Sequence, residues 1–337
     1  MLAPEAVGEA RQRIAAFINE TPLLHSSLLN RWLGHDFVFK VEGFQKVGAF
    51  KVRGALNALL CMQEQGSLPD KVIAFSSGNH AQAVAYAARQ LHVPAAIMLP
   101  ADSSPIKRQA TAGYGAEVVL TQSRLEAETK AAEFEAAGAY LLHPFDNDWI
   151  LAGQGTACYE ALHTGLRPDA IFATCGGGGW LSGTFLATQL LAPGTPVFGA
   201  EPMQANDAAR SYRGGKIVRL ADSPNTIADG ARTLNVSART FQYLQRLSGF
   251  YEVEEADILY WTQWLSHLLK TPVEPTSAVA MGGAFEWLEG QTQRRQVLVM
   301  LSGGNIAPET FRKIWAQDFL STTPDRYRKA ARTGAAT

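Results

Sequence analysis

Cysteine is scarce in this chain of 337 residues, which contains only Cys61, Cys158 and Cys175. Three scattered cysteines are too few for the disulfide framework of a small secreted domain, and their spacing does not fit a zinc site. Such a composition is typical of proteins from a reducing compartment. We therefore expect a cytoplasmic protein.

Also missing are an excess of charge of one sign and a long apolar run. The 30 Lys and Arg residues balance 31 Asp and Glu residues, for a formal net charge of −1. No basic excess indicates binding to nucleic acid or to an anionic membrane surface. No apolar run reaches the roughly 18 residues of a bilayer span, and residues 1–20 lack the apolar core of a secretory signal. We expect neither a nucleic-acid partner nor a membrane partner.

Short apolar runs that alternate with helical patterns are abundant instead. They predict an α/β fold with mainly parallel sheets flanked by helices. The first series of expected strands lies at residues 72–75, 95–99, 117–120 and 140–142. The second series lies at residues 170–174, 197–200, 250–253 and 297–301, and residues 37–41 are expected to join it.

The two series of strands predict two domains. We expect a large domain from residues 1–65 and 148–320, a small inserted domain at residues 66–147, and a C-terminal tail at residues 321–337. A chain of this length buries a substantial core. A cleft between the two domains is the place where a ligand is expected.

The most unusual segment is a run of four glycines, Gly176, Gly177, Gly178 and Gly179, between an expected strand and a helix that begins near Trp180. Successive glycines cost backbone entropy and add nothing to a core, so this position requires bare backbone. A strand, a loop without side chains and a helix N-terminus together present aligned N–H groups to an anion. The run therefore predicts a phosphate site.

The glycine run does not by itself identify the ligand that carries this phosphate. A dinucleotide fingerprint needs glycines at offsets of zero, two and five, and from Gly177 the third position is Ser182. Glu201, at the end of the next expected strand, lies where an acid binds a ribose in such folds. A nicotinamide-dependent oxidoreductase is therefore one hypothesis.

Lys51 lies in the segment GAFKVRGA, residues 48–55, just ahead of an expected helix. Most lysines are solvated surface groups, but this one is flanked by Phe50 and small residues. Burial and the positive end of a helix both lower the pKa of an ammonium group. Lys51 is therefore a candidate for Schiff-base chemistry.

A polar turn follows the expected strand at residues 72–75 and opens the next helix. Its residues are Ser76, Ser77, Gly78, Asn79 and His80. Hydroxyl, amide and backbone N–H groups converge there in a way that suits a carboxylate, and Ser and Asn are also common N-caps. A further turn, SGGN at residues 302–305, is a weak signal by itself.

Taken in order, GAFKVRGA, SSGNH, the four glycines and SGGN resemble the fold-type II pyridoxal-phosphate enzymes, which have a tryptophan synthase β-like fold. Further matching motifs are HPFD at residues 143–146, AGQGT at 152–156, TIADG at 226–230 and EPT at 274–276. The resemblance covers roughly residues 15–310 and is closest to the threonine/serine dehydratase and serine racemase group. It implies a two-domain α/β fold, pyridoxal 5'-phosphate as cofactor and a homodimer.

The resemblance also implies a role for each motif. Lys51 would bind the cofactor covalently, with Phe50 beside the pyridine ring and Asn79 bonded to the phenolic oxygen of the ring. The four glycines would hold the cofactor phosphate, and Ser302 would face the pyridine nitrogen. The turn at residues 76–80 would hold the carboxylate of an amino-acid substrate.

The implied reaction is the dehydration of a small β-hydroxy amino acid. The amine of Lys51 would remove the Cα proton, the β-hydroxyl would leave, and the released enamine would hydrolyse to a 2-oxo acid and ammonia. Threonine and serine are the first expected substrates, with 3-hydroxyaspartate and phenylserine as alternatives. Ser77 lies where racemases carry a second acid or base, so a serine racemase is a further alternative. A pyridoxal-phosphate-binding protein without catalysis is another class.

A cation site is implied at Glu201, Ala205 and Asp207. Metal-dependent members of the group bind Mg²⁺, Mn²⁺ or Ca²⁺ at these positions through two carboxylates and a backbone carbonyl, and all-oxygen ligation suits hard cations. Two positions depart from the expected pattern, since Ala49 replaces a serine and Trp180 is unusually bulky. Phe145 in HPFD resembles the dehydratases rather than the racemases.

Overall fold

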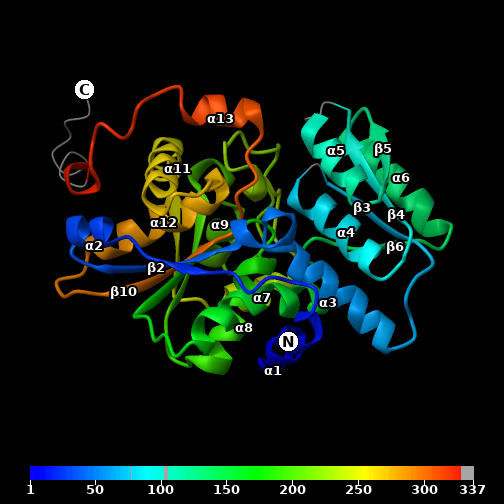
Figure 1. Ribbon diagram of the computed structural model, residues 1–337, viewed down its shortest axis with the longest axis horizontal. Coiled ribbons are helices and arrows are strands. Elements are labelled where there is room, and N and C mark those ends of the chain that lie inside the picture. Colours follow the sequence, from blue (N-terminus) through cyan, green and yellow to red (C-terminus); the bar gives the residue numbers. More distant parts are fainter. Residues whose placement is uncertain (77, 102–104, 328–337) are drawn as a thin grey trace.

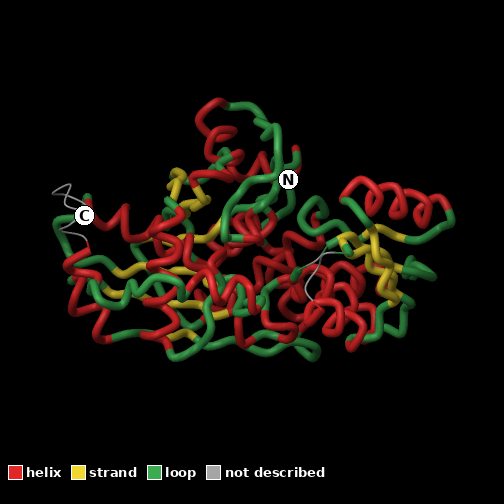
Figure 2. Tube along the Cα trace, turned by 90° about the horizontal axis from the view of Figure 1, so that it is seen from above, coloured by secondary structure: helices red, strands yellow, loops and turns green. Residues whose placement is uncertain are grey.

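Two largely parallel sheets, each covered by helices, organise the chain (Figure 1). The computed structural model describes residues 1–76, 78–101 and 105–327. Seen from above, the four-stranded sheet and its helices stand apart on the right from the strands on the left (Figure 2). The predicted α/β class is confirmed.

The larger sheet has six strands, in the order β1 (Leu23–Leu24), β2 (Asp36–Val41), β10 (Gln296–Leu301), β7 (Ala170–Thr174), β8 (Val197–Pro202) and β9 (Gly249–Val253). Only β1 runs antiparallel to its neighbour. In the register, Val299 lies opposite both Phe39 and Phe172. β7 and β8 are buried at every residue, because helices cover both faces of this sheet.

The smaller sheet has four parallel strands, in the order β5 (Glu117–Thr121), β4 (Ala95–Pro100), β3 (Val72–Phe75) and β6 (Tyr140–Leu141). The helices α4 (Asn79–Gln90), α5 (Pro105–Gly113) and α6 (Arg124–Ala136) connect successive strands. All these elements lie inside the range 66–147. The boundaries of the two domains stay a prediction.

The remaining helices are α1 (Glu5–Ile14), α2 (Ser27–Leu33), α3 (Lys51–Glu64), α7 (Asp148–His163), α8 (Gly179–Leu191), α9 (Asp207–Gly214), α10 (Ala238–Leu244), α11 (Glu255–Leu269), α12 (Pro275–Glu289) and α13 (Pro308–Ile314). Helices α7 and α8 share one core with Ile171 and Met300, and α11 and α12 share another with Phe172 and Val299. The alternation of β-strand side chains sends these neighbours to opposite faces. None of the helices in the described ranges has the length and apolar content needed to cross a membrane.

All nine predicted strands are present, with limits within two residues of those expected. The strand β1 was not predicted, because two residues paired at a sheet edge produce no readable alternation. Part of the predicted tail also packs firmly. The ring of Tyr327 stacks on Tyr260 with 3.8 Å between centroids, and the carbonyl of Thr322 accepts hydrogen bonds from Tyr260 and Trp264.

Helices α3, α7 and α8 approach one another closely through glycines of the AGQGT motif. A Cβ atom on Gly155 would lie 2.5 Å from the carbonyl oxygen of Gly183 in α8. A Cβ atom on Gly153 would lie 2.5 Å from the carbonyl oxygen of Arg53 in α3. Any side chain at either position would push the helices apart. These glycines therefore fix the position of α3, the helix that begins with Lys51.

A buried ion network joins α3 to the rest of the large sheet. The guanidinium group of Arg53 donates two hydrogen bonds to Glu42, at 2.6 and 2.9 Å, and two to Glu160 of α7, both at 2.8 Å. Lys40 of β2 also donates to Glu160, at 2.7 Å. Burial opposes ionisation here, but the two carboxylates raise the pKa of Arg53 above its usual range. Paired and fully hydrogen-bonded, these charges tolerate complete burial.

Replacing Arg53 by Met should lower the free energy of unfolding by about 3–5 kcal/mol, because Glu42 and Glu160 lose their main counter-charge inside the protein. Urea unfolding of purified variants measures the loss. Arg294→Met is the matched control, since Arg294 forms an exposed pair with Asp36 that is worth at most about 1 kcal/mol. Equal unfolding midpoints for the two variants would contradict the structural role of Arg53.

Candidate active site

A cavity of about 800 Å³ lies at the carboxyl ends of strands from both sheets. Ligands bind at this edge in open α/β sheets generally. Its lining includes all predicted cofactor and substrate residues within the described part of the chain: Phe50, Lys51, Ser76, Gly78, Asn79, His80, Gly176, Gly177, Gly178, Gly179 and Ser302. Ser77 lies outside the described residues. Segments far apart in the sequence thus meet around one space.

Lys51 is the first residue of α3, and its side chain reaches into the cavity. Its Nζ atom donates a hydrogen bond to the carbonyl of Pro144 at 3.1 Å and lies 5.0 Å from the centre of the Phe50 ring. Burial lowers the pKa of Lys51 to about 8. A useful fraction of the amine is therefore neutral near physiological pH, as a nucleophile or base requires.

The polar turn between β3 and α4 offers backbone N–H groups to the cavity, and none of its described side chains is charged. The hydroxyl of Ser76 accepts a hydrogen bond from the N–H of Gly78 at 3.2 Å. The ring of His80 donates from Nε2 to the carbonyl of Leu142 at 2.7 Å. Burial, and next the charge of Lys51, lower the pKa of His80 to about 3, so its ring is neutral. An anion at this turn would rely on N–H groups at the start of α4.

Asn79 belongs to a polar cluster centred on Glu274, which sequence reasoning did not single out as a site residue. The Nδ2 atom of Asn79 lies 2.9 and 3.1 Å from the two carboxylate oxygens of Glu274. Asn305 donates to the same carboxylate through its backbone at 2.8 Å, and its side chain donates to Oδ1 of Asn79 at 2.9 Å. The cluster holds Asn79 in one orientation. The EPT motif contains Glu274 but carries no signal for this contact.

The glycine loop follows β7 and leads directly into α8, which has no side-chain cap at its N-terminus. Its N–H groups are therefore available to an anion. Neighbouring side chains also require bare backbone here. A Cβ atom on Gly177 would lie 2.2 Å from the ring of Phe145, and one on Gly179 would lie 2.7 Å from Gln154. Gly178 has a φ of +88°, which side chains disfavour.

Ser302 follows β10 and is almost fully buried at the cavity wall. Its hydroxyl lies 3.0 Å from the hydroxyl of Ser277, which also accepts a hydrogen bond from the N–H of Gly303 at 3.0 Å. The contact of Ser302 is thus with a neutral group. A ring nitrogen at this position would meet a hydroxyl rather than a carboxylate.

Two bulky aromatic residues, Phe145 and Trp180, line the site. Phe145 belongs to the HPFD motif, and Trp180 is the residue that departs from the expected family pattern. The ring of Trp180 lies 4.1 Å from the ring of Phe50, centroid to centroid. Phe145 covers Gly177, as the close approach of its ring shows. His143 beside it accepts hydrogen bonds at Nδ1 from the N–H groups of Phe145 and Asp146, so its proton sits on Nε2. The bulky residues are accommodated because the loop has no side chains.

Glu201 and Asp207 come together at the end of β8 and the start of α9, and both are fully buried. Glu201 accepts hydrogen bonds from the N–H groups of Ala209, at 2.7 Å, and Ala208, at 3.4 Å. Neither carboxylate oxygen of Asp207 has a partner in the described structure. Burial raises the pKa of Asp207 to about 7, and burial with the charge of Asp207 raises that of Glu201.

These two acids do not form a complete metal centre by themselves. Within the described residues, no three or more His, Cys, Asp or Glu side chains gather as a metal site would require. Ala205 is buried in the short 3-10 helix Met203–Ala205 between the two acids. Unpartnered carboxylate oxygens beside a backbone turn still have the chemistry of a hard-cation site.

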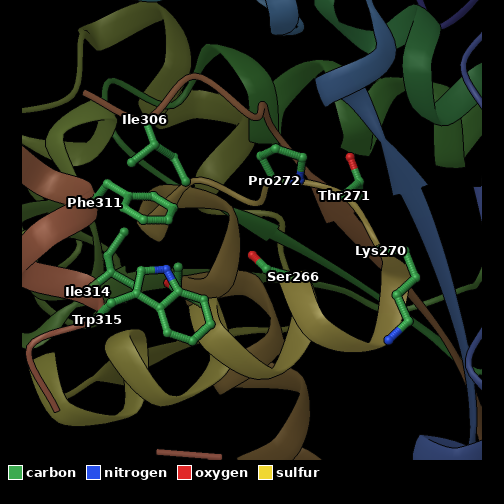
Figure 3. A pocket seen from close by; sticks show the side chains of 9 residues that line it. Ser266, Lys270, Thr271, Pro272, Ile306, Phe311, Ile314 and Trp315 are labelled. Atoms are coloured by element: carbon green, nitrogen blue, oxygen red, sulfur yellow. The ribbon is translucent and has the colours of Figure 1, made fainter. Parts of the chain in front are cut away.

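A second cavity of about 240 Å³ lies between α11 and α13 (Figure 3). Its lining is mostly apolar, with Ile306, Phe311, Ile314 and Trp315 on one side, while Lys270 lies at the other end. None of the predicted site residues lines it. The predicted cofactor and substrate residues in the described part of the chain are therefore gathered in the larger cavity.

Comparison with known proteins identifies relatives along almost the whole chain. The family model described as "Pyridoxal-phosphate dependent enzyme" matches residues 14–303. The chain is 40% identical over 301 residues to L-threo-3-hydroxyaspartate ammonia-lyase of Saccharomyces cerevisiae, and the match covers 88% of this chain and 91% of the relative. It is 38% identical to serine racemase of Schizosaccharomyces pombe, over 92% of this chain and 96% of the relative.

A solved structure agrees with these matches. The crystal structure of a threonine deaminase from T.th. has a TM-score of 0.83 and 40% identity, covering 91% of this chain and 99% of that chain. By their names, the two sequence relatives are an ammonia-lyase and a racemase of amino acids. The threonine deaminase shares the fold described above. This chain belongs to the family of pyridoxal-phosphate-dependent enzymes.

Proposed function

We propose that this protein is a pyridoxal-phosphate-dependent ammonia-lyase that converts small β-hydroxy amino acids to a 2-oxo acid and ammonia. The position of Lys51 carries the proposal, since its amine enters a large cavity between the glycine loop and Ser302 with a pKa lowered to about 8. L-Threonine and L-serine are the first candidate substrates. The nicotinamide hypothesis is set aside, because it leaves Lys51 unexplained and does not fit the family.

The residues around the cavity fit pyridoxal phosphate. The loop at residues 176–179 offers uncapped N–H groups in a space that side chains would fill, which suits the phosphate. Phe50, Asn79 and Ser302 line the cavity. In this proposal Phe50 would contact the face of the ring, Asn79 would bond its phenolic oxygen, and Ser302 would face its nitrogen. When bound, pyridoxal phosphate supplies an electron sink for negative charge at Cα.

Lys51 serves as the base in this proposal. Its neutral amine takes the Cα proton onto Nζ, and the nearby carbonyl of Pro144 accepts a hydrogen bond from the resulting ammonium group. The turn at residues 76–80 holds the substrate carboxylate through N–H groups, since the ring of His80 is neutral and bonded to Leu142. The hydroxyl of Ser302 does not enforce protonation of a ring nitrogen, which favours loss of a β-substituent over other fates of the carbanion.

Serine racemase activity is the second candidate. It is favoured by the 38% identity to the Schizosaccharomyces pombe relative, and it requires an acid or base on the second face of the substrate. Ser77 is the residue proposed for that role. Chiral analysis of serine recovered from a partial reaction distinguishes the two activities, because a dehydratase without racemase activity leaves no D-serine.

We also propose that Glu201, Asp207 and the carbonyl of Ala205 bind Mg²⁺, Mn²⁺ or Ca²⁺. The two unpartnered oxygens of Asp207, buried next to a second carboxylate, support this proposal. A divalent cation there would neutralise two adjacent buried carboxylates, of which Glu201 accepts hydrogen bonds from the N–H groups of Ala208 and Ala209.

Lys51→Ala should lower the rate of 2-oxo acid release at least about 100-fold, because the base for the Cα proton is lost. Wild-type protein should be yellow with pyridoxal phosphate, and borohydride should bleach the colour and attach the cofactor to Lys51, as peptide mass spectrometry measures. Lys46→Ala, an exposed lysine five residues earlier, is the matched control. Substantial residual turnover in Lys51→Ala would refute the role of Lys51.

Yellow wild-type protein that releases no 2-oxo acid from any β-hydroxy amino acid would favour a non-catalytic binding protein.

The rate at which cofactor-stripped protein recovers its yellow colour should rise between pH 7 and pH 9, with a midpoint near the Lys51 pKa of about 8. The sign follows from burial, which lowers the pKa and leaves more nucleophilic amine at a given pH than an exposed lysine of pKa about 10.4 would offer. Stopped-flow absorbance at several pH values measures the rate. A midpoint above pH 10 would show that burial does not lower the pKa of Lys51.

Addition of Mg²⁺ or Ca²⁺ to EDTA-treated protein should raise its Tm by several degrees, since a ligand at 100 times its Kd adds about 2.7 kcal/mol. Asp207→Asn should abolish the rise. In EDTA the same variant should be at least as stable as the wild type, because one of two adjacent buried carboxylates is gone. Differential scanning fluorimetry measures the Tm of the wild type and of Asp207→Asn, each in EDTA and with the added cation. An unchanged wild-type Tm with every cation would exclude the site.

A further inference from the structure

One wall of the cavity carries two arginines that none of the roles above uses. Arg219 lies in the segment 217–220, and Arg232 follows the short 3-10 helix Asp229–Ala231. A backbone hydrogen bond from the N–H of Leu220 to the carbonyl of Leu234, 2.8 Å long, holds the two segments side by side. Both guanidinium groups therefore belong to one continuous wall.

The hydrogen bonds of these arginines are with neutral groups. Arg232 donates through Nε to the carbonyl of Thr226 at 2.8 Å, and its Nη2 donates to the same oxygen. Arg219 donates to the amide oxygen of Asn235. No ion pair between either arginine and a carboxylate is found among the described residues. Another acid of the cavity lining, Asp146, is already paired, because Arg239 forms a salt bridge with it at 3.1 Å.

A third polar group of the same wall also lacks a partner. The hydroxyl of Thr233, next to Arg232, is buried and makes no hydrogen bond in the described structure. A buried hydroxyl without a partner costs free energy, so such a group commonly marks a place for a ligand or a water. The wall thus offers two guanidinium groups and one hydroxyl. Asp229 lines the same cavity, but neither arginine forms an ion pair with a carboxylate among the described residues.

The proposed reaction leaves one part of the substrate to contact this wall. The glycine loop takes the cofactor phosphate, and the turn at residues 76–80 takes the α-carboxylate. The side chain beyond Cβ is then the group left for the segments 217–220 and 229–236. A methyl group or a hydrogen atom there offers no hydrogen bond to the Thr233 hydroxyl and no charge to the arginines, whereas a carboxylate matches the planar fork of arginine.

We propose that Arg219, Arg232 and Thr233 bind a second carboxylate, on Cβ of the substrate, and that the preferred substrate class is the β-hydroxy dicarboxylic amino acids, with 3-hydroxyaspartate as the smallest member. This inference rests on the proposed ammonia-lyase function. In the reaction the Cα–H and Cβ–O bonds break and water leaves. The enamine becomes an imine, and water returns to release ammonia. One 3-hydroxyaspartate thus gives one oxaloacetate and one ammonia, without an oxidant or reductant.

The test compares kcat/KM for L-threo-3-hydroxyaspartate and L-serine on the holoenzyme, with ammonia release as the readout. The dicarboxylate should be preferred, and Arg219→Gln and Arg232→Gln should each lower its kcat/KM about 10-fold to 100-fold through KM, as loss of a charged hydrogen bond predicts. The value for serine should change little. Lys216→Gln is the matched control, because Lys216 is an exposed cation just before the segment 217–220 and does not line the cavity.

Ionic strength gives a second readout that a merely structural role would not move. These exposed charges are screened at 1 M salt, where the Debye length is about 3 Å. KM for 3-hydroxyaspartate should therefore rise with KCl in the wild type and respond less in the double variant Arg219→Gln/Arg232→Gln. KM for serine should be insensitive in both proteins.

The outcomes separate this inference from the proposed function. Release of ammonia from serine, with equal losses for both substrates in the arginine variants, would overturn the second-carboxylate site and leave the lyase function standing. A preference for phenylserine would also overturn it, and would assign the side chain to the apolar Ile217, Leu234 and Val236 of the same wall. No ammonia from any β-hydroxy amino acid would refute the proposed function itself.

Discussion

The placement of Lys51 depends on the buried guanidinium group two residues further along α3. Arg53 is bonded on one side to Glu42, which follows β2, and on the other to Glu160 of α7. A planar fork held at both edges leaves the first turn of α3 little freedom to rotate or slide. The direction in which Lys51 leaves the helix is therefore set by charges that lie outside the cavity.

The same turn of α3 is held from its other side by close backbone packing. Gly153 of α7 touches the carbonyl of Arg53, and Gly155 touches Gly183 of α8. Helix α8 in turn begins at the glycine loop. The proposed base, Lys51, and the proposed phosphate site, the glycine loop, thus stand on helices that are fixed to each other through contacts that tolerate no side chain. Burial of Lys51 follows from this geometry, and desolvation is the cause of its lowered pKa.

How far the sequence predicts the site depends on whether a feature is local. Apolar runs predict every strand of four residues or more, because burial on both faces of a sheet is written into consecutive residues. The glycine run and the lysine before α3 are local as well. The link of Asn79 to Glu274 joins residues 195 apart, and nothing in either segment signals the other. The arginine wall is equally hidden, since residues 217–236 form irregular loops without periodicity.

In the proposed function, proton transfer and substrate selection rely on separate groups of this cavity. Desolvation by burial is the cause of the lowered pKa of Lys51. The arginines are exposed, so solvent screens their field over the distance of a Debye length. We therefore expect a change of charge on their wall to alter which substrate side chain binds, without altering the amine proposed to take the proton. Enzymes of one family are able to exchange substrates through such loops while α3, α7, α8 and the glycine loop stay as they are.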